Sequence, residues 1–223
     1  RDGYVTDPLN GRSYNDKDTS AFRAGLYITP GPRTDIVVSA DYTRERPGLT
    51  VGRQENTLVA TPLIVRGGVA QPRPGGPLIA PPTGEFNFRS AATTSTTNSN
   101  ELDLWGGAVT VSFDMNEAWT LKSISAYRDL QYNDYIDIDA NPVQIGDVFV
   151  GVQQSQVSQE FQALYDAGGK FSMVGGLYFI QENIKSQQNA FFDDFAFQGT
   201  ALAPGVLYTG ATRFIDDDQE LQS

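Results

Sequence analysis

The spacing of the turns is the feature that most constrains the fold of this chain. Six segments show a period-two alternation of apolar and polar residues, and the connections between them measure 4, 54, 4, 21 and 4 residues. The segments are 18–29, 34–46, 101–114, 119–133, 155–166 and 171–184. Successive connections of an antiparallel meander lie at opposite ends of its strands, so the three four-residue turns fall at one end. The pattern predicts an all-β, antiparallel, up-and-down sheet with long loops 47–100, 134–154 and 185–223 at the other end.

The alternation assigns faces in some segments and not in others. Along 101–114, Trp105 and Val109 alternate with Ala108 and Thr110, which predicts one apolar face. Both faces of 119–133 carry apolar residues, so its facing and that of 171–184 stay open. These residues are Leu121 and Tyr127 on one face, and Ile124 and Ala126 on the other. Within 47–100, proline disfavours strands in the Pro-rich part, and short strands are compatible with Leu58 to Val65 or Glu85 to Arg89.

Composition removes several classes of protein. No run of 18 apolar residues is present, which excludes a helical membrane protein, whereas strands of a membrane barrel need only weak alternation. The sequence has no cysteine and no histidine, so thiolate and imidazole chemistry is absent. The formal net charge of −11 repels a nucleic-acid backbone. We expect no enzyme activity, no cofactor and no nucleic-acid partner.

The acidic clusters do not resemble catalytic or metal sites. Asp134, Asp137 and Asp139 lack the glycine and distal glutamate of a calcium loop, so a solvated loop is favoured and no metal site is assigned. A third hypothesis, paired-carboxylate hydrolysis by Asp193 and Asp194, is disfavoured because neighbouring residues of a strand point to opposite faces.

Three strings resemble barrel strands of TonB-dependent receptors. Segment 120–129 reads Thr-Leu-Lys-Ser-Ile-Ser-Ala-Tyr-Arg-Asp, similar to the T-L-x-S-x-x-A-Y-R pattern of that family. Segments 147–161 and 174–179 look like the next strands in the same order, and the resemblance covers most of residues 18–182. It implies active uptake of a siderophore or another scarce nutrient across the bacterial outer membrane.

The resemblance also implies partners. Receptors of this family resemble barrels of about 22 strands closed by a plug, and they take energy from an inner-membrane complex through a TonB-type protein. Residues 1–223 carry no plug, no coupling box and no terminal aromatic strand. We therefore expect a partial barrel of about six strands, in contact with outer-membrane lipid, the rest of the barrel and plug, and a ligand such as a ferric siderophore.

An orientation follows from this interpretation. The turns at Pro30, Met115 and Ala167 are expected to face the periplasm and the long loops the exterior. Aromatic residues flank two of these turns, where an interfacial girdle is expected. They are Phe113 and Trp119 at one turn, and Tyr165 and Phe171 at the other.

The outer end of 119–133 carries the candidate ligand contacts. Arg128, Tyr132 and Tyr135 offer a guanidinium and two aromatic rings to an anionic or aromatic ligand. Lumen lining and girdle packing are the alternatives for these three residues. The competing function is a soluble extracellular β-domain, an adhesin or carbohydrate-binding module, which the acidity and the Gly/Ser/Thr content suggest.

Overall fold

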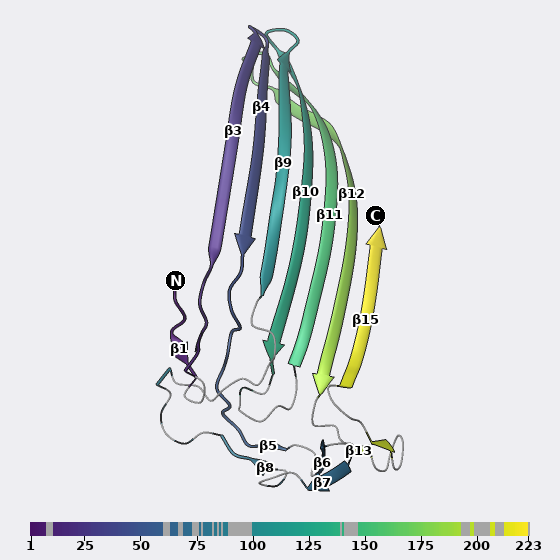
Figure 1. The fold of residues 1–223 in the computed structure, drawn as a ribbon. Helices are drawn as coiled ribbons and strands as arrows, with labels where there is room; N and C mark the ends of the chain where they lie inside the picture. Colours follow the sequence, from purple (N-terminus) through teal and green to yellow (C-terminus); the bar gives the residue numbers. More distant parts are fainter. Residues whose placement is uncertain are drawn as a thin grey trace.

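A single antiparallel sheet of seven strands dominates the fold. The computed structural model describes residues 1–7, 11–59, 63–66, 69–72, 76, 78–81, 83, 85, 87–88, 100–138, 140, 147–192, 197–198, 206–207 and 212–222. The strand order is β15-β12-β11-β10-β9-β4-β3 (Figure 1). The strands are β3 (Thr19–Gly31), β4 (Thr34–Glu45), β9 (Glu101–Asp114), β10 (Trp119–Asp137), β11 (Asp147–Asp166), β12 (Ser172–Phe192) and β15 (Thr212–Gln222). The expected all-β, antiparallel up-and-down architecture is confirmed.

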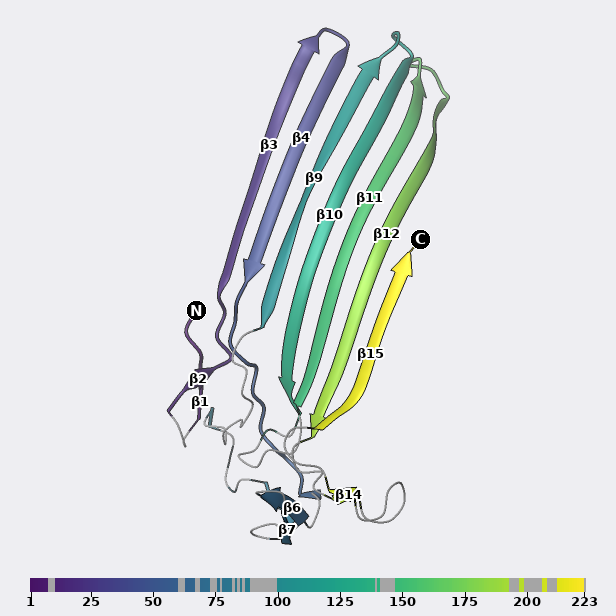
Figure 2. The ribbon, with the colours of Figure 1, turned by 45° about the vertical axis from the view of Figure 1, so that its right-hand side comes forward.

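The three short turns lie together at one end of this sheet. Figure 2 shows the β3–β4, β9–β10 and β11–β12 turns at the top of one curved layer, with the described parts of the long connections at the bottom. Side chains cap two of the turns: Asn116 Oδ1 accepts hydrogen bonds from the amides of Ala118 and Trp119, and Asp166 Oδ1 accepts one from the amide of Gly168. Gly168 has φ +71°, a conformation that glycine adopts without strain.

Two central strands are longer than the sequence predicts. β9 has the predicted bounds, but β10 continues to Asp137 and β11 begins at Asp147, so residues 134–137 and 147–154 of the expected loop 134–154 are strand. The register remains continuous from Asn133 opposite Gly151 to Asp137 opposite Asp147. Backbone pairing with a neighbour therefore extends these strands through residues whose own pattern shows no apolar alternation.

The segment 185–223 also contains strand that the sequence does not predict. β12 runs to Phe192, and β15 pairs with its residues Asn183–Phe192, so the expectation of about six strands is one too few. Strand formers are sparse in β15, which includes Asp216 to Asp218, and its ladder partner supplies the hydrogen bonds. Here too, pairing overrides a weak local preference.

The described part of the segment 47–100 contains four short strands. β5 (Leu58–Val59) pairs with β8 (Leu78–Ile79), and β6 (Leu63–Arg66) pairs with β7 (Val69–Pro72). The possible strand at Leu58 to Val65 thus corresponds to β5 and β6. Residues 85, 87 and 88 are not in a strand, and the other residues of the second possible strand, Glu85 to Arg89, lie outside the described part of the chain.

Two further strand pairs lie outside this segment. They are β1 (Val5–Thr6) with β2 (Ser13–Tyr14) and β13 (Phe197–Gln198) with β14 (Val206–Leu207).

The strand register sorts the side chains of the main sheet into two faces. Leu121 lies opposite Phe113, and Tyr127 lies opposite Gly107, so these residues of β10 share a face with Trp105 and Val109. We call this the apolar face. It includes Phe22, Leu26, Ile36, Val38, Tyr42, Trp105, Val109, Val111, Phe113, Leu121, Tyr127, Val157, Phe161, Met173, Leu177 and Phe179. The opposite side, which we call the polar face, carries Arg23, Asp35, Asp41, Thr110, Lys122, Arg128, Gln156, Ser158, Glu160, Gln162 and Glu182. It also carries apolar residues, among them Tyr27, Val37, Ile124, Val174, Tyr178 and Ile180.

The buried core of the described residues lies outside the sheet, at its loop end. Four buried side chains, Val5, Tyr14, Leu49 and Val51, pack together there. The side-chain amide of Asn15 joins the two segments, because its Oδ1 accepts from the Val51 amide at 2.8 Å and its Nδ2 donates to the Val51 carbonyl at 3.3 Å. We call residues 1–7, 11–17 and 47–54 the loop-end platform.

The platform is attached to the sheet at the end of β10. Tyr135 of β10 packs against the four-residue core. The Asn100 amide donates to the Pro47 carbonyl, and Asn100 Oδ1 accepts from the Tyr135 amide beyond the point where β9 stops. Asn100 thus provides hydrogen bonds to β10 and to the platform next to Glu101, where the pairing of β9 with β10 ends.

Candidate functional site

The apolar face is exposed over most of its extent. Its side chains include Leu177, 77% exposed, Phe22, 68%, Phe179, 59%, and Phe161, 54%. A contiguous surface of this kind on a protein in water marks an interaction site or an aggregation hazard. The fold therefore presents this face to an apolar environment or to another protein.

Two rows of aromatic side chains bound the apolar face. The loop-side aromatic row consists of Phe22, Tyr42, Trp105 and Tyr127, and the turn-side aromatic row of Phe113, Trp119, Tyr165 and Phe171. The ring centroids of Trp105 and Tyr127 are 5.1 Å apart, and those of Trp119 and Tyr165 are 5.0 Å apart. The predicted grouping of aromatic residues around the short turns is present, and the loop-side row accompanies it.

The distance between these rows matches the dimensions of a membrane. Trp105 and Phe113 are eight residues apart on β9, as are Trp119 and Tyr127 on β10. Eight residues of strand rise about 27 Å. At the tilt of strands in outer-membrane barrels, this becomes a band of roughly 20 Å, close to their apolar band of about 25 Å.

Polar side chains in the middle of the apolar face bond to one another. Ser123 and Ser125 of β10 flank Gln159 of β11, whose side-chain nitrogen Nε2 donates to Ser123 Oγ at 3.0 Å. Ser125 Oγ donates to Gln159 Oε1 at 2.5 Å. Internal pairing of this kind is what polar groups need where water is absent.

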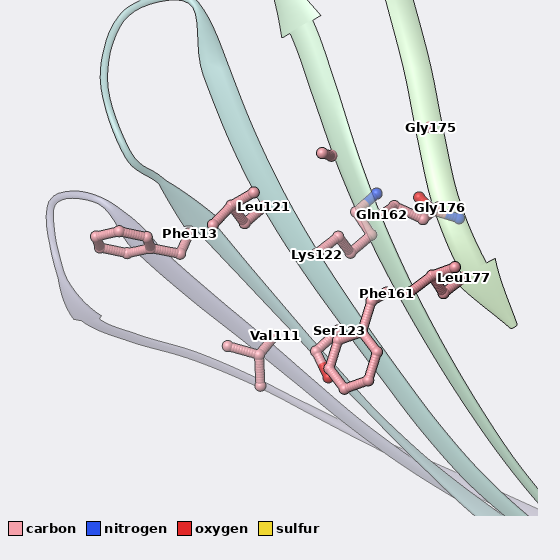
Figure 3. A pocket seen from close by; sticks show the side chains of 11 residues that line it. Val111, Phe113, Leu121, Lys122, Ser123, Phe161, Gln162, Gly175, Gly176 and Leu177 are labelled. Carbon is pink, nitrogen blue, oxygen red and sulfur yellow. The ribbon is translucent and has the colours of Figure 1, made fainter. Parts of the chain in front are cut away.

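A groove of about 570 Å³ lies between these serines and the short turns. Figure 3 shows Phe161, Leu121 and Leu177 around it, contributed by three neighbouring strands. Ala163 and Gly175 face each other across β11 and β12, and their small size hollows the surface. The groove belongs to the apolar face and follows from small residues between large ones.

An ion pair spans three strands of the polar face. Both terminal nitrogens of Arg128 on β10 reach the Asp41 carboxylate on β4, at 2.8 and 3.0 Å. Gly106 of β9 lies beneath the Arg128 side chain, and a Cβ at this position would approach Cγ and Cδ of Arg128 to 3.3 Å and the Tyr127 carbonyl to 2.8 Å. Arg23 lies opposite Asp41 on β3. Two arginines therefore flank one carboxylate.

The structure separates the three residues predicted to contact a ligand. Arg128 and Tyr132 lie on the polar face, where Arg128 is paired with Asp41 and Tyr132 is beside Asp134. Tyr135 lies on the other side, with its ring 4.8 Å from that of Phe149 and against the loop-end platform. Side chains at an odd spacing along a strand point to opposite faces, and Arg128 and Tyr135 have such a spacing. The sequence therefore already indicated that these two residues face apart.

A second charged cluster lies at the loop end of β4 and β9. Arg46 bonds to the Asp103 carboxylate and donates to the Leu102 carbonyl, while the Tyr42 hydroxyl donates to Asp103 Oδ1 at 2.8 Å. The hydrogen bond that Arg46 donates to Asp103 is the main cause of a raised pKa at Arg46. Sequence reasoning did not identify this cluster, because Tyr42 and Arg46 precede Asp103 by 61 and 57 residues and meet it only through strand register.

Within the described residues, no helix is long and apolar enough to cross a membrane. Across the same described ranges, no three acidic side chains converge as metal ligands. Asp139 of the acidic triplet, and Asp193 and Asp194 of the carboxylate pair, lie outside those ranges.

Comparison with known proteins supports the fold. No family model matches the chain, and no curated protein sequence matches it. Among solved structures, the ferric yersiniabactin uptake receptor FyuA from Yersinia pestis is similar, with a TM-score of 0.55 and 15% identity over 87% of this chain. The chain spans 26% of the length of that receptor. At this identity, the likeness shows a shared strand arrangement with an uptake receptor.

Proposed function

We propose that this chain forms part of the wall of a TonB-dependent receptor in the bacterial outer membrane. The observation that carries the proposal is the exposed apolar face bounded by the loop-side and turn-side aromatic rows. In this arrangement the apolar face contacts lipid, the polar face lines the lumen, and the turns lie in the periplasm. The strand strings of the sequence and the likeness to the ferric yersiniabactin uptake receptor support the same arrangement.

The proposal assigns active uptake rather than catalysis. A siderophore or another scarce nutrient binds from the loop end, and a TonB-type partner supplies energy through a plug. Of the predicted contacts, Arg128 and Tyr132 have the orientation that a lumen ligand requires. The soluble β-domain is disfavoured, because water would surround the apolar face.

Sidedness tests the proposal directly. Single cysteines at Asn56→Cys, next to the loop-end platform, and at Glu117→Cys, in the β9–β10 turn, are introduced into the complete gene. An impermeant maleimide should label the first in intact cells and the second only after the outer membrane is permeabilised. Recovery of the complete protein as a soluble monomer, or equal labelling of both sites in intact cells, contradicts the proposal.

A further inference from the structure

Six polar side chains form a regular array on the continuation of the apolar face beyond the loop-side aromatic row. Strand register places Asp129, Ser155 and Asn183 in one row and Gln131, Gln153 and Lys185 in the next. We call these six residues the rim grid. Together with neighbouring residues of β10 and β11 they line a groove of about 330 Å³.

The rim grid is continuous with the aromatic boundary. Asp129 is the register partner of Trp105, and the Tyr127 hydroxyl donates to Asp129 Oδ2 at 3.2 Å. If the aromatic rows mark the edges of the hydrocarbon, as the proposed function holds, the rim grid lies at the level of the outer-leaflet head groups. Its strands continue outward to Asp137 and Phe192.

The chemistry of the rim grid suits a neutral, hydroxyl-rich group. Its three side-chain amides each offer donors and an acceptor, and Ser155 offers both, which matches hydroxyls that also donate and accept. Its charges are one carboxylate, Asp129, and one ammonium, Lys185, so it lacks the concentration of positive charge that phosphate recognition uses. Trp105 lies opposite Asp129 and the Tyr127 hydroxyl bonds to it, so their two neighbouring rings place flat apolar surface beside the rim grid.

We propose that the rim grid binds the saccharide head group of an outer-leaflet glycolipid. The inference rests on the proposed function, because it requires this face to meet lipid. It goes beyond uptake by assigning a lipid site on the outside of the wall, separate from the polar face that carries Arg128. Hydrogen bonds from the amides of Gln131, Gln153 and Asn183 select the sugar.

The test uses the complete protein, purified in detergent and incubated with one of three lipids. Digalactosyldiacylglycerol carries a neutral disaccharide, phosphatidylglycerol an anionic phosphate, and phosphatidylcholine a zwitterionic head group. Retained lipid is counted by native mass spectrometry. The digalactosyl lipid should be retained in preference to both phospholipids.

A triple variant, Gln131→Ala with Gln153→Ala and Asn183→Ala, should lower retention of the digalactosyl lipid about ten-fold or more, because each amide contributes a net hydrogen bond. The matched control removes three polar side chains from the opposite face, Thr110→Ala with Gln156→Ala and Ser158→Ala, and should retain the lipid as the unaltered protein does. Heat-dependent electrophoretic migration verifies that each barrel is folded. If the triple variant does not fold, Gln153→Glu replaces it in the test. This substitution keeps the side-chain length and replaces the amide donor with a charge, and it should weaken retention of the digalactosyl lipid.

Equal retention by grid and control variants overturns the lipid site. Preference for phosphatidylglycerol overturns the saccharide assignment in favour of a phosphate site. Both results leave the proposed function standing, whereas absence of the complete protein from the outer membrane removes the proposed function and this inference together.

Discussion

At the scale of single residues, two glycines with the same chemistry have different structural roles. Gly106 leaves room for the Arg128 side chain to cross β9, and a Cβ there would meet the Tyr127 carbonyl at 2.8 Å. Gly175 faces the groove on the apolar face, and no atom lies within 4 Å of the point that a Cβ would occupy. Glycine is required at position 106 because β10 and Arg128 approach it closely, whereas position 175 has room for a methyl group.

Gly106→Ala should lower the free energy of unfolding by about 1–3 kcal/mol, because the added methyl group displaces Arg128 or the backbone of β10. Gly175→Ala is the control and should change it by less than about 0.5 kcal/mol. Urea unfolding of the complete protein in lipid vesicles measures both. Equal stability of the two variants would show that the close approach at Gly106 carries no cost.

The Arg128–Asp41 pair itself contributes less than its geometry suggests. Half of the Arg128 side chain is exposed, so solvent screens the attraction and the pair contributes at most about 1 kcal/mol. Its role is orientation, because it holds the guanidinium over β9 and beside Arg23. A double-mutant cycle between Asp41→Asn and Arg128→Gln should therefore give a coupling energy below about 1 kcal/mol, and a larger value would mean that the site is shielded from water.

At the scale of elements, adjacent residues of each strand face different surroundings. Val109 and Thr110 are neighbours on β9, but register places Val109 on the apolar face and Thr110 on the polar face. A strand in a membrane barrel alternates between lipid and lumen in this way. Substitutions at these two positions therefore compare the two faces of the sheet on the same strand and at nearly the same depth in the proposed membrane.

Val109→Lys should cost about 2–4 kcal/mol of stability in vesicles, because the ammonium meets hydrocarbon near the middle of the band. Thr110→Lys should be tolerated, because its side chain remains on the polar face. Folded fractions of the complete protein after vesicle insertion provide the measurement. Equal tolerance of lysine at both positions would argue against lipid on the apolar face.

At the scale of the whole molecule, the described residues form a thin sheet and a small packed platform. The sheet leaves its side chains largely exposed, and the buried apolar cluster lies in the loop-end platform. Leu49 is 0% exposed there, and Asn15 joins its segment to the first residues of the chain. Packing of the platform is therefore local to the loop end, and the sheet depends on strand pairing.

Leu49→Ala should destabilise the platform by about 2–5 kcal/mol through the cavity that it leaves. Proteolysis of the folded complete protein should then become faster within 47–57, while the unfolding midpoint of the sheet stays unchanged. Leu78→Ala is the control, since Leu78 is 64% exposed and its truncation leaves no cavity. A lowered midpoint for the sheet in Leu49→Ala would show that the two parts unfold together.

The sequence by itself determined the strand count to within one, the ends of β9, and the separation of short turns from long loops. These features depend on local alternation and turn residues, which neighbouring residues encode. The odd spacing between Arg128 and Tyr135 also contains the information that they face apart, because side chains alternate along a strand.

Only the tertiary structure decided the facing of β10 and β12, the extension of β10 and β11, and the addition of β15. Alternation already puts Leu121 and Ile124 on different faces, but both are apolar, so pairing with Phe113 and Thr110 of β9 is what decides which of them joins the apolar face. β15 becomes a strand because β12 offers unpaired backbone groups, which its own residues do not reveal. Local patterns specify which residues alternate, whereas register between strands specifies what each face meets.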